Sequence, residues 1–381
     1  MSEAQAPIAV GIDYTPAHEQ GGGIGRYVRE LTAALAESPE EFRFSLFAAG
    51  AVGCASPFAN HPRFTWHPTR LTPQWWARIW HRLRLPIPIE AIVGNVKLYH
   101  ATDFVLPPVQ ARSLLTVHDL SFVRVPATAS PPLKRYLDRV VPRSVLRADH
   151  ILADSAATKD DLIELYGTPS SKITVLYSGV GSRFSPTKDS HIRRMVLEKY
   201  HLPDRPYILS VGTVQPRKNY ARLVRAVAVL RERGIDIDVV IAGGRGWLED
   251  SIYQAVDETM MTEHVHFAGF VDDVDLPALY SAALVTALPS LYEGFGIPIL
   301  ESMACGVPVI TSNVSSLPEV GGDAAVTISP TDLDSIIDGL QRVLEDQSLR
   351  DQMIARGFSR AAQFSWRSAA AHLRQVYRSL L

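Results

Sequence analysis

The stretch that decides the fold is Ser290–Gly306, SLYEGFGIPILESMACG. The apolar run before it, Leu284–Leu288, predicts a buried strand. Glycine permits a left-handed backbone and close approach of other groups, and proline suits the first turn of a helix. We therefore expect a loop over Glu293–Ile297 and a helix over Pro298–Cys305. A strand, a glycine turn and a helix in this order aim backbone N–H groups and a helix dipole at an anion.

Two carboxylates, Glu293 and Glu301, accompany this glycine turn. We place Glu293 at the mouth of a pocket and Glu301 one turn inside the helix, on the same side of that pocket. Because like charges repel, acids beside an anion site bind hydroxyls rather than the anion. The stretch therefore predicts a ligand with both phosphate and hydroxyls, such as a nucleotide-sugar. The alternative is a solvated loop acid followed by a first-turn acid that the helix dipole favours.

The rest of the chain repeats this alternation of strands and helices, which is typical of a parallel sheet covered by helices on both faces. The pattern restarts after a polar, proline-bearing passage at 182–190. We therefore expect an α/β protein with two Rossmann-like, doubly wound domains over residues 1–185 and 186–365, and a ligand cleft between them. A basic amphipathic helix at 366–381 is expected to cross back to the first domain.

The predicted strands are short apolar runs bounded by turn residues. In order, they are Ile8–Ile12, Phe42–Ala48, Phe64–His67, Lys97–His100, Leu114–His118, His150–Ala153, Ile173–Tyr177, Tyr207–Val211, Asp238–Ala242, Val265–Phe267, Leu284–Leu288, Val307–Thr311 and Ala325–Ile328.

The composition describes an ordinary globular protein. The 381 residues are 46% hydrophobic and 20% charged, and the formal net charge of −2 gives no general attraction to nucleic acid. The two cysteines, Cys54 and Cys305, offer neither a metal cluster nor a disulfide framework, which favours a reducing cytosol. The N-terminal residues lack the pattern of a signal peptide, and no apolar run is long enough to span a bilayer. We expect a cytoplasmic protein that contacts a membrane only peripherally.

A basic pair follows the first predicted strand of the second domain. The loop VGTVQPRKN places Arg217 and Lys218 at the carboxyl end of that strand. Arginine offers a bidentate fork and lysine a point charge, and the pair suits a diphosphate. The alternative is a solvated pair of surface cations, but a position at a strand end in the same domain as Glu293 favours the diphosphate.

The first domain offers two further candidates. The loop Thr15–Gly25 is rich in glycine but lacks the G-x-G-x-x-G spacing of dinucleotide sites, so it predicts a turn-rich loop that is either functional or simply flexible. His118 ends a predicted strand and could donate to a sugar hydroxyl or a developing charge. It could equally be a satisfied core histidine. Asp154 and Ser155 end another strand, and Ser155 could cap the next helix.

Seven motifs are spread over nearly the whole chain: GGIGRYV at 22–28, TVHDLSF at 116–122, ADSAATKDDL at 153–162, PRKN at 216–219, IAGG at 241–244, VHFAGFVDD at 265–273 and EGFGIPILE at 293–301. Together these motifs resemble the retaining nucleotide-sugar glycosyltransferases of family four, which have the GT-B architecture of two Rossmann domains. Within that family the chain is most similar in appearance to bacterial mannosyl- and rhamnosyltransferases that build O-antigen or other surface polysaccharide.

The resemblance implies roles for individual residues. Arg217 and Lys218 would hold the donor diphosphate and neutralise its charge as it leaves. Glu293 would grip sugar hydroxyls, and His118 would contact the donor sugar near the anomeric centre. Glu301 would bind the ribose. The other implied donor contacts come from glycines, backbone amides and the border of the base pocket: Gly22, Gly23, Gly243, Val271, Gly294, Phe295, Gly296 and Ile297.

The resemblance also implies a reaction. The anomeric configuration is retained without a protein nucleophile, and neither a cofactor nor a metal is expected, because cations and amides stabilise the leaving group. The preferred donor is GDP-mannose and the preferred acceptor a lipid-linked sugar. A sugar-nucleotide epimerase, a phosphorylase of the same architecture and a non-catalytic nucleotide-sugar-binding protein remain as alternatives. No segment suggests the lysine that a phosphorylase would need for pyridoxal phosphate.

A final feature is the local charge of residues 71–147, which contain 11 Lys and Arg against 4 Asp and Glu. Within them, Leu71–Pro88 (LTPQWWARIWHRLRLPIP) gathers tryptophans beside arginines. On a helical wheel Trp76, Ile79, Trp80 and Leu83 share one face, which is typical of a helix lying in a membrane interface. We expect this segment to dock the protein on an anionic inner leaflet. The alternative is that the same face packs on the domain core.

Overall fold

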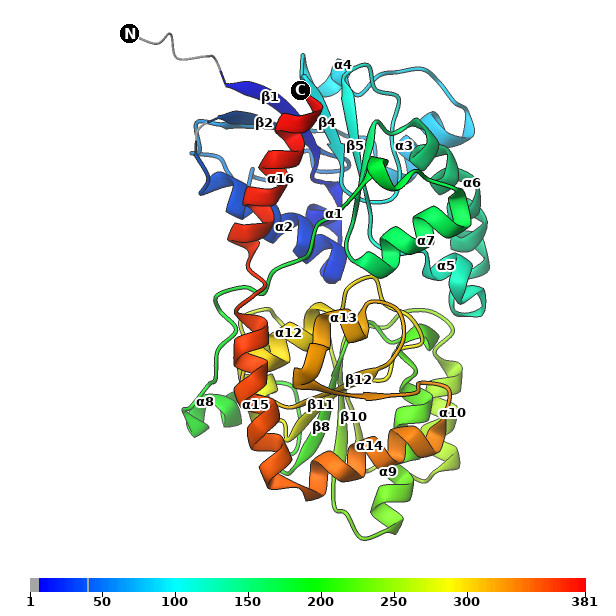
Figure 1. The fold of residues 1–381 in the computed structure, drawn as a ribbon, viewed down its shortest axis with the longest axis vertical. Coiled ribbons are helices and arrows are strands. Elements are labelled where there is room, and N and C mark those ends of the chain that lie inside the picture. The colour runs from blue at the N-terminus through cyan, green and yellow to red at the C-terminus, as the bar shows by residue number, and fades with distance from the viewer. Residues whose placement is uncertain (1–6, 40) are drawn as a thin grey trace. The chain divides into compact units, whose positions relative to one another are not determined.

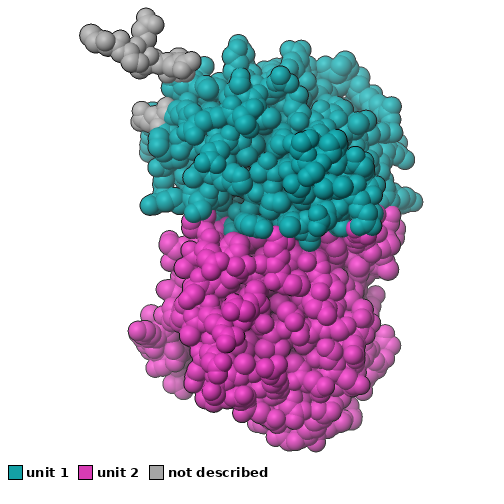
Figure 2. Space-filling model, in the orientation of Figure 1, with its two compact units in different colours: residues 1–120, 135–178, 366–381 teal, residues 121–134, 179–365 magenta. Residues whose placement is uncertain are grey.

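The structure is a computed structural model that describes residues 7–39 and 41–381. Residues 1–6 belong to the segment for which we predicted that no signal peptide is present, and they lie outside the described residues. Two compact units divide the chain (Figure 2). Unit 1 comprises Met1–Leu120, Arg135–Ser178 and Trp366–Leu381, whereas unit 2 comprises Ser121–Lys134 and Gly179–Ser365. Each unit contains one parallel sheet with flanking helices (Figure 1). The predicted pair of Rossmann-like α/β domains is confirmed.

Unit 1 is built on a seven-stranded sheet in the order β3-β2-β1-β4-β5-β6-β7, and each neighbouring pair of strands is parallel. Its strands are β1 (Ile8–Asp13), β2 (Phe42–Ala48), β3 (Phe64–Pro68), β4 (Leu98–Ala101), β5 (Arg112–Val117), β6 (His150–Ala153) and β7 (Ile173–Val175). Its main helices are α1 (Thr15–Glu19), α2 (Gly23–Ala36), α3 (Pro73–Ala77), α4 (Glu90–Val93), α6 (Pro131–Arg147, which begins in unit 2), α7 (Ala156–Tyr166) and α16 (Trp366–Leu380).

Unit 2 is built on a six-stranded parallel sheet in the order β10-β9-β8-β11-β12-β13. Its strands are β8 (Tyr207–Val211), β9 (Asp238–Ala242), β10 (Val265–Gly269), β11 (Val285–Leu288), β12 (Val309–Ser312) and β13 (Ala325–Ile328). Its helices include α5 (Ser121–Arg124), α8 (Ser190–Lys199), α9 (Tyr220–Glu232), α10 (Asp250–Glu258), α11 (Leu276–Ala282), α12 (Ile297–Ala304), α13 (Leu317–Gly321), α14 (Leu333–Glu345) and α15 (Gln347–Ala361).

The strand order identifies the part of each sheet where a ligand is expected. In each unit, the first three strands in sequence follow one another towards one side of the sheet, and the next strand lies on the other side of the first strand. This reversal falls between β1 and β4 in unit 1 and between β8 and β11 in unit 2. Loops that leave neighbouring strands in opposite directions open a crevice at their carboxyl ends, and doubly wound proteins bind ligands there. In unit 2 this position lies between the loops that follow β8 and β11.

The glycine loop after β1 differs from its prediction. Thr15–Glu19 forms the short helix α1, with Pro16 in its first turn and Thr15 and Ala17 buried, rather than a continuous turn-rich loop. Proline fixes φ at a helical value in the first turn, but the prediction was based on the glycines of the segment and did not use this proline signal. Gly21 and Gly22 therefore form the connection to α2, whereas Gly23 and Gly25 lie in its first turn.

The C-terminal helix α16 packs on α2 within unit 1. Its apolar face, including Leu373 and Tyr377, joins the same buried cluster as Val28 and Leu31 of α2. The Tyr377 hydroxyl lies 2.9 Å from Nδ1 of His100 on β4. The described residues contain no helix long and apolar enough to cross a membrane.

Candidate active site

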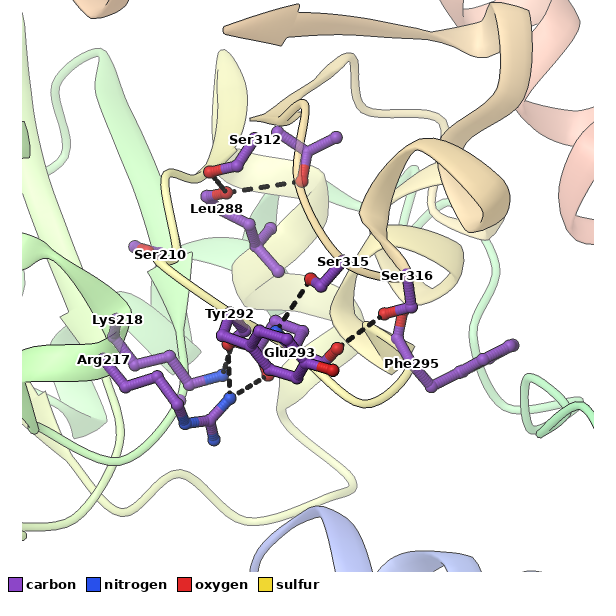
Figure 3. Close-up of polar contacts among 12 residues, drawn as sticks. Ser210, Arg217, Lys218, Leu288, Tyr292, Glu293, Phe295, Ser312, Ser315 and Ser316 are labelled. Carbon is purple, nitrogen blue, oxygen red and sulfur yellow. Dashed lines mark hydrogen bonds and ion pairs between the residues drawn. The ribbon is translucent and has the colours of Figure 1, made fainter. Parts of the chain in front are cut away.

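The loops after β8 and β11 bring three charged side chains together in unit 2 (Figure 3). Nη1 of Arg217 lies 2.7 Å from Oε2 of Glu293, and Nζ of Lys218 lies 2.7 Å from Oε1 of the same carboxylate. All three side chains are largely buried, with exposed fractions of 16% for Arg217, 11% for Lys218 and 9% for Glu293. The two cations predicted at one strand end and the acid predicted at another therefore form one cluster.

The electrostatics of the cluster keep Glu293 ionised. Burial alone would raise the pKa of Glu293, but the charges of Arg217 and Lys218 and the hydrogen bond from Lys218 lower its pKa to about 2. The two cations thus lie against opposite oxygens of one ionised carboxylate. A buried cation pair held in place in this way is suited to binding a phosphate group.

The backbone fixes where the two cations point. Pro216–Lys218 forms one turn of 3₁₀ helix, and Asn219 ends it in the left-handed conformation with φ of 61°. The Asn219 side-chain amide donates to the carbonyl oxygens of Pro289 and Pro330 at 2.9 and 2.8 Å. Arg217 also donates to the carbonyl oxygen of Tyr292 at 2.7 Å. The loops after β8 and β11 are therefore tied together by both backbone and side-chain contacts.

Gly212 is a residue of this site that the sequence reasoning missed. Its φ is +150°, and a Cβ at this position would lie 2.7 Å from Cε of Lys218. The absence of a side chain lets the lysine lie across the strand end. The available signal was a glycine directly after the last residue of a predicted strand, the position at which Rossmann folds allow close approach.

The glycine turn before α12 is held by two serines that were also missed. The Glu293 N–H donates to Oγ of Ser315 at 2.9 Å, and the Ser316 hydroxyl donates to the carbonyl oxygens of Glu293 and Phe295 (Figure 3). Gly296 is the N-cap residue of α12 and has a left-handed backbone with a φ of 103°. The turn is therefore rigid before any ligand binds.

The other predicted positions of this turn are core or backbone positions. Gly294 lies in the loop, and Ile297 begins α12, one residue earlier than predicted. The Phe295 ring is buried against Phe364, with ring centroids 5.8 Å apart. These residues can therefore offer a ligand mainly their backbone amides.

Glu301 is a buried residue of α12. It is fully buried, and its Oε2 accepts a hydrogen bond from the Tyr280 hydroxyl on α11 at 2.9 Å. Its placement on the same side of a pocket as Glu293 stays a prediction.

Gly243 and Val271 follow β9 and β10. The Gly243 N–H donates to the carbonyl oxygen of Gly269 at 2.8 Å, and a Cβ on Gly243 would lie 2.0 Å from the carbonyl oxygen of Gly212. Val271 is 5% exposed and belongs to an apolar cluster beneath these loops. The turns after β8, β9 and β10 are thus in direct contact, which requires glycine at position 243.

His118 is deeply buried in unit 1, and both of its ring nitrogens have partners. Nδ1 lies 2.7 Å from Oδ2 of Asp154, and Nε2 lies 2.8 Å from the carbonyl oxygen of Thr102. The Thr102 carbonyl can only accept, so Nε2 carries the proton of that hydrogen bond, and an ionised Asp154 makes Nδ1 a second donor, which makes the ring an imidazolium. Burial alone would lower the pKa of His118, but Asp154 and the charge of Asp103 raise it to about 9. In this arrangement neither nitrogen is available to a sugar hydroxyl.

The glycines at the start of α2 include one tight position. A Cβ at Gly22 or Gly23 would meet no atom within 4 Å, whereas a Cβ at Gly25 would lie 1.9 Å from the carbonyl oxygen of Gln20. Gly22 and Gly23 are therefore free to approach another molecule. Gly25 is required for α2 to pack against the end of α1.

The exposed face predicted for a helix in Leu71–Pro88 is wrong for Trp76 and Trp80, whereas Leu83 of the same face is 64% exposed. Trp76 and Trp80 stack with ring centroids 4.3 Å apart and both contact Phe47 on β2. The helical part of the segment is Pro73–Arg82, because α3 passes directly into a π-helical turn that ends at Arg82. A helical wheel identifies residues that share a face but does not say whether the face points inward. The exposed apolar residues of this segment are Leu71, Trp75, Leu83, Leu85 and Ile87.

Among residues 7–39 and 41–381 there is no group of three or more His, Cys, Asp or Glu side chains arranged to hold a metal ion.

Comparisons with known proteins place this geometry in a family. The families described as "Glycosyltransferase Family 4" and "Glycosyl transferases group 1" match residues 21–183 and 196–360, respectively. The "O-antigen chain mannosyltransferase B" of Escherichia coli is 34% identical over 370 residues, which cover 94% of this chain and 96% of that protein.

Solved structures share the fold at lower sequence identity. The sucrose-phosphate synthase of Thermosynechococcus elongatus has a TM-score of 0.75 at 23% identity and covers 98% of both chains. HepE of Anabaena in complex with UDP and glucose has a TM-score of 0.75 at 18% identity, covering 98% of this chain and 100% of its own. The chain belongs to the family 4, group 1 glycosyltransferases, with the GT-B architecture of two Rossmann-like domains.

Proposed function

We propose that this protein is a retaining glycosyltransferase that moves an α-mannosyl group from GDP-mannose to a hydroxyl of a lipid-linked or oligosaccharide acceptor in surface polysaccharide synthesis. One observation carries the proposal: the Arg217–Lys218–Glu293 cluster at the switch point of the unit 2 sheet. The choice of mannose and of the O-antigen rests on the similarity to the Escherichia coli mannosyltransferase.

Arg217 and Lys218 bind the donor diphosphate and stabilise the charge that grows on it as the glycosidic bond breaks. Glu293 is 2.7 Å from both cations, so its main role is to hold them at a fixed separation before the donor arrives. Cations that are already in place do not have to reorganise during the reaction, and each such stabiliser typically contributes about 10²–10³ in rate.

The nucleoside lies against the turns that follow β9, β10 and β11. Backbone amides of Gly294–Ile297 contact donor hydroxyls and phosphate, while Gly243 and Val271 border the base and ribose. Glu301 exchanges its hydrogen bond with Tyr280 for a ribose hydroxyl when the donor binds. This last assignment predicts that Tyr280→Phe changes the donor KM more than kcat, because a ribose contact is made equally in the ground and transition states.

In unit 1, Gly22 and Gly23 let the start of α2 approach the substrates. His118 acts indirectly, because its hydrogen bond to the Thr102 carbonyl fixes the loop that follows β4. The acceptor hydroxyl attacks from the face that the diphosphate leaves, and its proton passes to a phosphate oxygen. The bond to the anomeric carbon is thus replaced on the same face, and the configuration is retained.

The two cations make a metal ion unnecessary at the diphosphate. We expect full activity in excess EDTA, measured with protein that has been dialysed against the chelator. An absolute and saturable requirement for Mn²⁺ or Mg²⁺ would contradict this assignment.

The direct test is incubation with GDP-, UDP-, dTDP- and ADP-sugars and a lipid-linked acceptor, followed by NMR of the product. The proposal predicts transfer of mannose from GDP-mannose and an α-linked product. Release of an epimerised free donor, phosphorolysis, or donor binding without turnover would overturn it in favour of an epimerase, a phosphorylase or a binding protein.

We further propose that unit 1 docks on an anionic membrane through a strap that comprises Arg82–Ile87. All six of its residues are exposed, and it alternates the cations Arg82 and Arg84 with the apolar side chains Leu83 and Leu85. Beside it, the Arg78 guanidinium lies over the exposed Trp75 ring at 4.6 Å. Basic and apolar side chains on one exposed strap suit an anionic headgroup layer, where each cation contributes about 1 kcal/mol.

Co-sedimentation with anionic and neutral vesicles tests this docking. The variant Arg82→Glu/Arg84→Glu is compared with Arg139→Glu/Arg143→Glu, which changes the same charge on the exposed side of α6. Docking through the strap is supported if the wild type binds anionic vesicles in a salt-sensitive way and only Arg82→Glu/Arg84→Glu loses this binding. Equal loss in both variants, or no binding by the wild type, would refute it.

A further inference from the structure

Unit 2 contains a cavity at the amino ends of its strands, whereas the Arg217–Lys218–Glu293 cluster lies at their carboxyl ends. The cavity, of about 680 Å³, lies beside Tyr207, which begins β8, and Leu284, which precedes β11. Arg217 and Lys218 follow the other end of β8, so the length of that strand separates the two places. The proposed function uses none of the residues that line this cavity.

The wall formed by α8 and the following loop is cationic. Three guanidinium groups line the cavity, those of Arg193, Arg194 and Arg205, against the single carboxylate of Asp204. The apolar side chains of Leu197 and Leu284 contribute to the same lining. The volume is within the range of small-molecule sites, which is roughly 300–1,000 Å³. A cavity of this kind favours a small anion that also carries a carbon skeleton.

The three arginines differ in how far their charge is compensated. Arg205 is paired with Asp236 at 2.7 Å and approaches Asp238 at 3.5 Å. Arg194 is two-thirds exposed and only approaches carboxylates, Glu198 at 3.7 Å and Asp204 at 4.0 Å. Arg205 therefore forms a neutralised wall, whereas Arg194 can move to meet a ligand.

Arg193 carries the uncompensated charge. Its Nη1 donates to the carbonyl oxygens of Thr187 and Lys188 at 2.8 and 3.4 Å. In the described part of the chain no carboxylate oxygen lies within 4.0 Å of its side-chain nitrogens. The residue is only partly exposed. A half-buried guanidinium that is held only by neutral acceptors gains more from an anion than a solvated one does.

We propose that this cavity binds a hexose phosphate, separately from the donor. The phosphate lies on Arg193, with Arg194 as a second donor. The Asp204 carboxylate accepts hydrogen bonds from sugar hydroxyls, since an ionised carboxylate can only accept. The less polar face of the sugar ring lies on Leu197 and Leu284.

Isothermal titration calorimetry with mannose 6-phosphate as the probe tests this site. We expect wild-type protein to bind it at least about tenfold more tightly than inorganic phosphate, and not to bind mannose. Arg193→Gln should weaken binding by about tenfold or more, the loss typical of one charge-assisted hydrogen bond. Arg225→Gln, which removes an exposed arginine paired with Glu258, is the matched control and should bind as wild type.

Two further variants distinguish this site from the donor site. Lys218→Ala should lose affinity for GDP but keep its affinity for mannose 6-phosphate, whereas Arg193→Gln should show the reverse. If Arg193→Gln does not fold, Arg194→Glu reverses a rim charge that is two-thirds exposed and should weaken binding in the same way.

Several results would overturn the proposal. Unchanged affinity in both the Arg193 and Arg194 variants would show that these guanidiniums are not the phosphate site. Loss of mannose 6-phosphate binding in Lys218→Ala would show that mannose 6-phosphate binds at the donor site instead. Equal affinity for inorganic phosphate and mannose 6-phosphate would contradict the proposed contacts between the cavity and the sugar. Failure of the transferase assay together with selective mannose 6-phosphate binding would contradict only the proposed function.

Discussion

Lys218 and Glu293 form a buried ion pair with Nζ 2.7 Å from Oε1, although 75 positions separate them in the chain. Their strands, β8 and β11, are neighbours in the sheet at its switch point. Arg217 completes the cluster from the other carboxylate oxygen. The two cations and the acid that pairs with them therefore come from two loops that only the sheet topology brings together.

Glu293→Gln should destabilise unit 2, because it removes the only negative charge of the Arg217–Lys218–Glu293 cluster and leaves two largely buried cations together. Breaking a buried ion pair on one side typically costs about 3–5 kcal/mol. Urea unfolding should show a clear loss of unfolding free energy relative to wild type. The double variant Glu293→Gln/Lys218→Met should recover part of this loss, and a double variant that is less stable than Glu293→Gln would contradict the assigned pairing.

The same carboxylate predicts a pH dependence of stability. The folded pKa of Glu293, about 2, lies below its ordinary value of 4.5. A group with a lowered folded pKa stabilises the protein above the unfolded pKa, and this contribution is lost as the pH falls from about 4.5 towards 2. Unfolding free energies measured across this range should fall more steeply for wild type than for Glu293→Gln. Identical slopes would contradict the pKa assignment.

His118 predicts the opposite pH dependence. Its folded pKa of about 9 lies above its ordinary value of 6.5. The stabilisation is therefore complete below about 6.5 and is lost as the pH rises through 9. NMR titration of the imidazole should show a doubly protonated ring at neutral pH. His118→Gln should unfold with less dependence on pH between 6.5 and 9, and a neutral ring at pH 7 in the wild type would refute the double hydrogen bond.

Gly22, which precedes α2, and Gly25, in its first turn, provide a matched pair of variants. Gly25→Ala should strongly destabilise the protein, since its Cβ would lie 1.9 Å from the Gln20 carbonyl oxygen. Gly22→Ala should change stability by less than about 1 kcal/mol, because no atom lies within 4 Å of the added methyl group. Thermal unfolding of the two variants checks this difference. Equal melting temperatures would show that the connection is not packed as described.

Much of the fold was predictable from the sequence because buried parallel strands are nearly continuous apolar runs. The bounds of Phe42–Ala48, His150–Ala153 and Asp238–Ala242 agree with the structure. The helix after the Glu293 turn was also predictable, from the glycine and proline that precede it, to within one residue. Ser155 caps α7 by accepting from the Thr158 N–H at 3.1 Å, as its position before the helix suggested.

Other features depend on contacts between distant segments. The helical wheel grouped Trp76 with Trp80 correctly, but Phe47 on β2 decides that their face points inward. In the same way, only the neighbouring strand β6 brings Asp154 to His118 and makes its ring an imidazolium. Periodicity defines the face of an element, whereas the neighbour that covers the face comes from the tertiary structure.

The central claim is that Arg217 and Lys218 stabilise the departing diphosphate. The most direct measurement is the single-turnover rate of mannosyl transfer from GDP-mannose by wild type, Lys218→Ala, Arg217→Ala and the control Arg225→Ala, each confirmed to be folded. We predict a loss of about 10²–10³ in rate for each cluster variant at saturating donor, and no loss for the control. Wild-type rates in Lys218→Ala and Arg217→Ala would contradict the account.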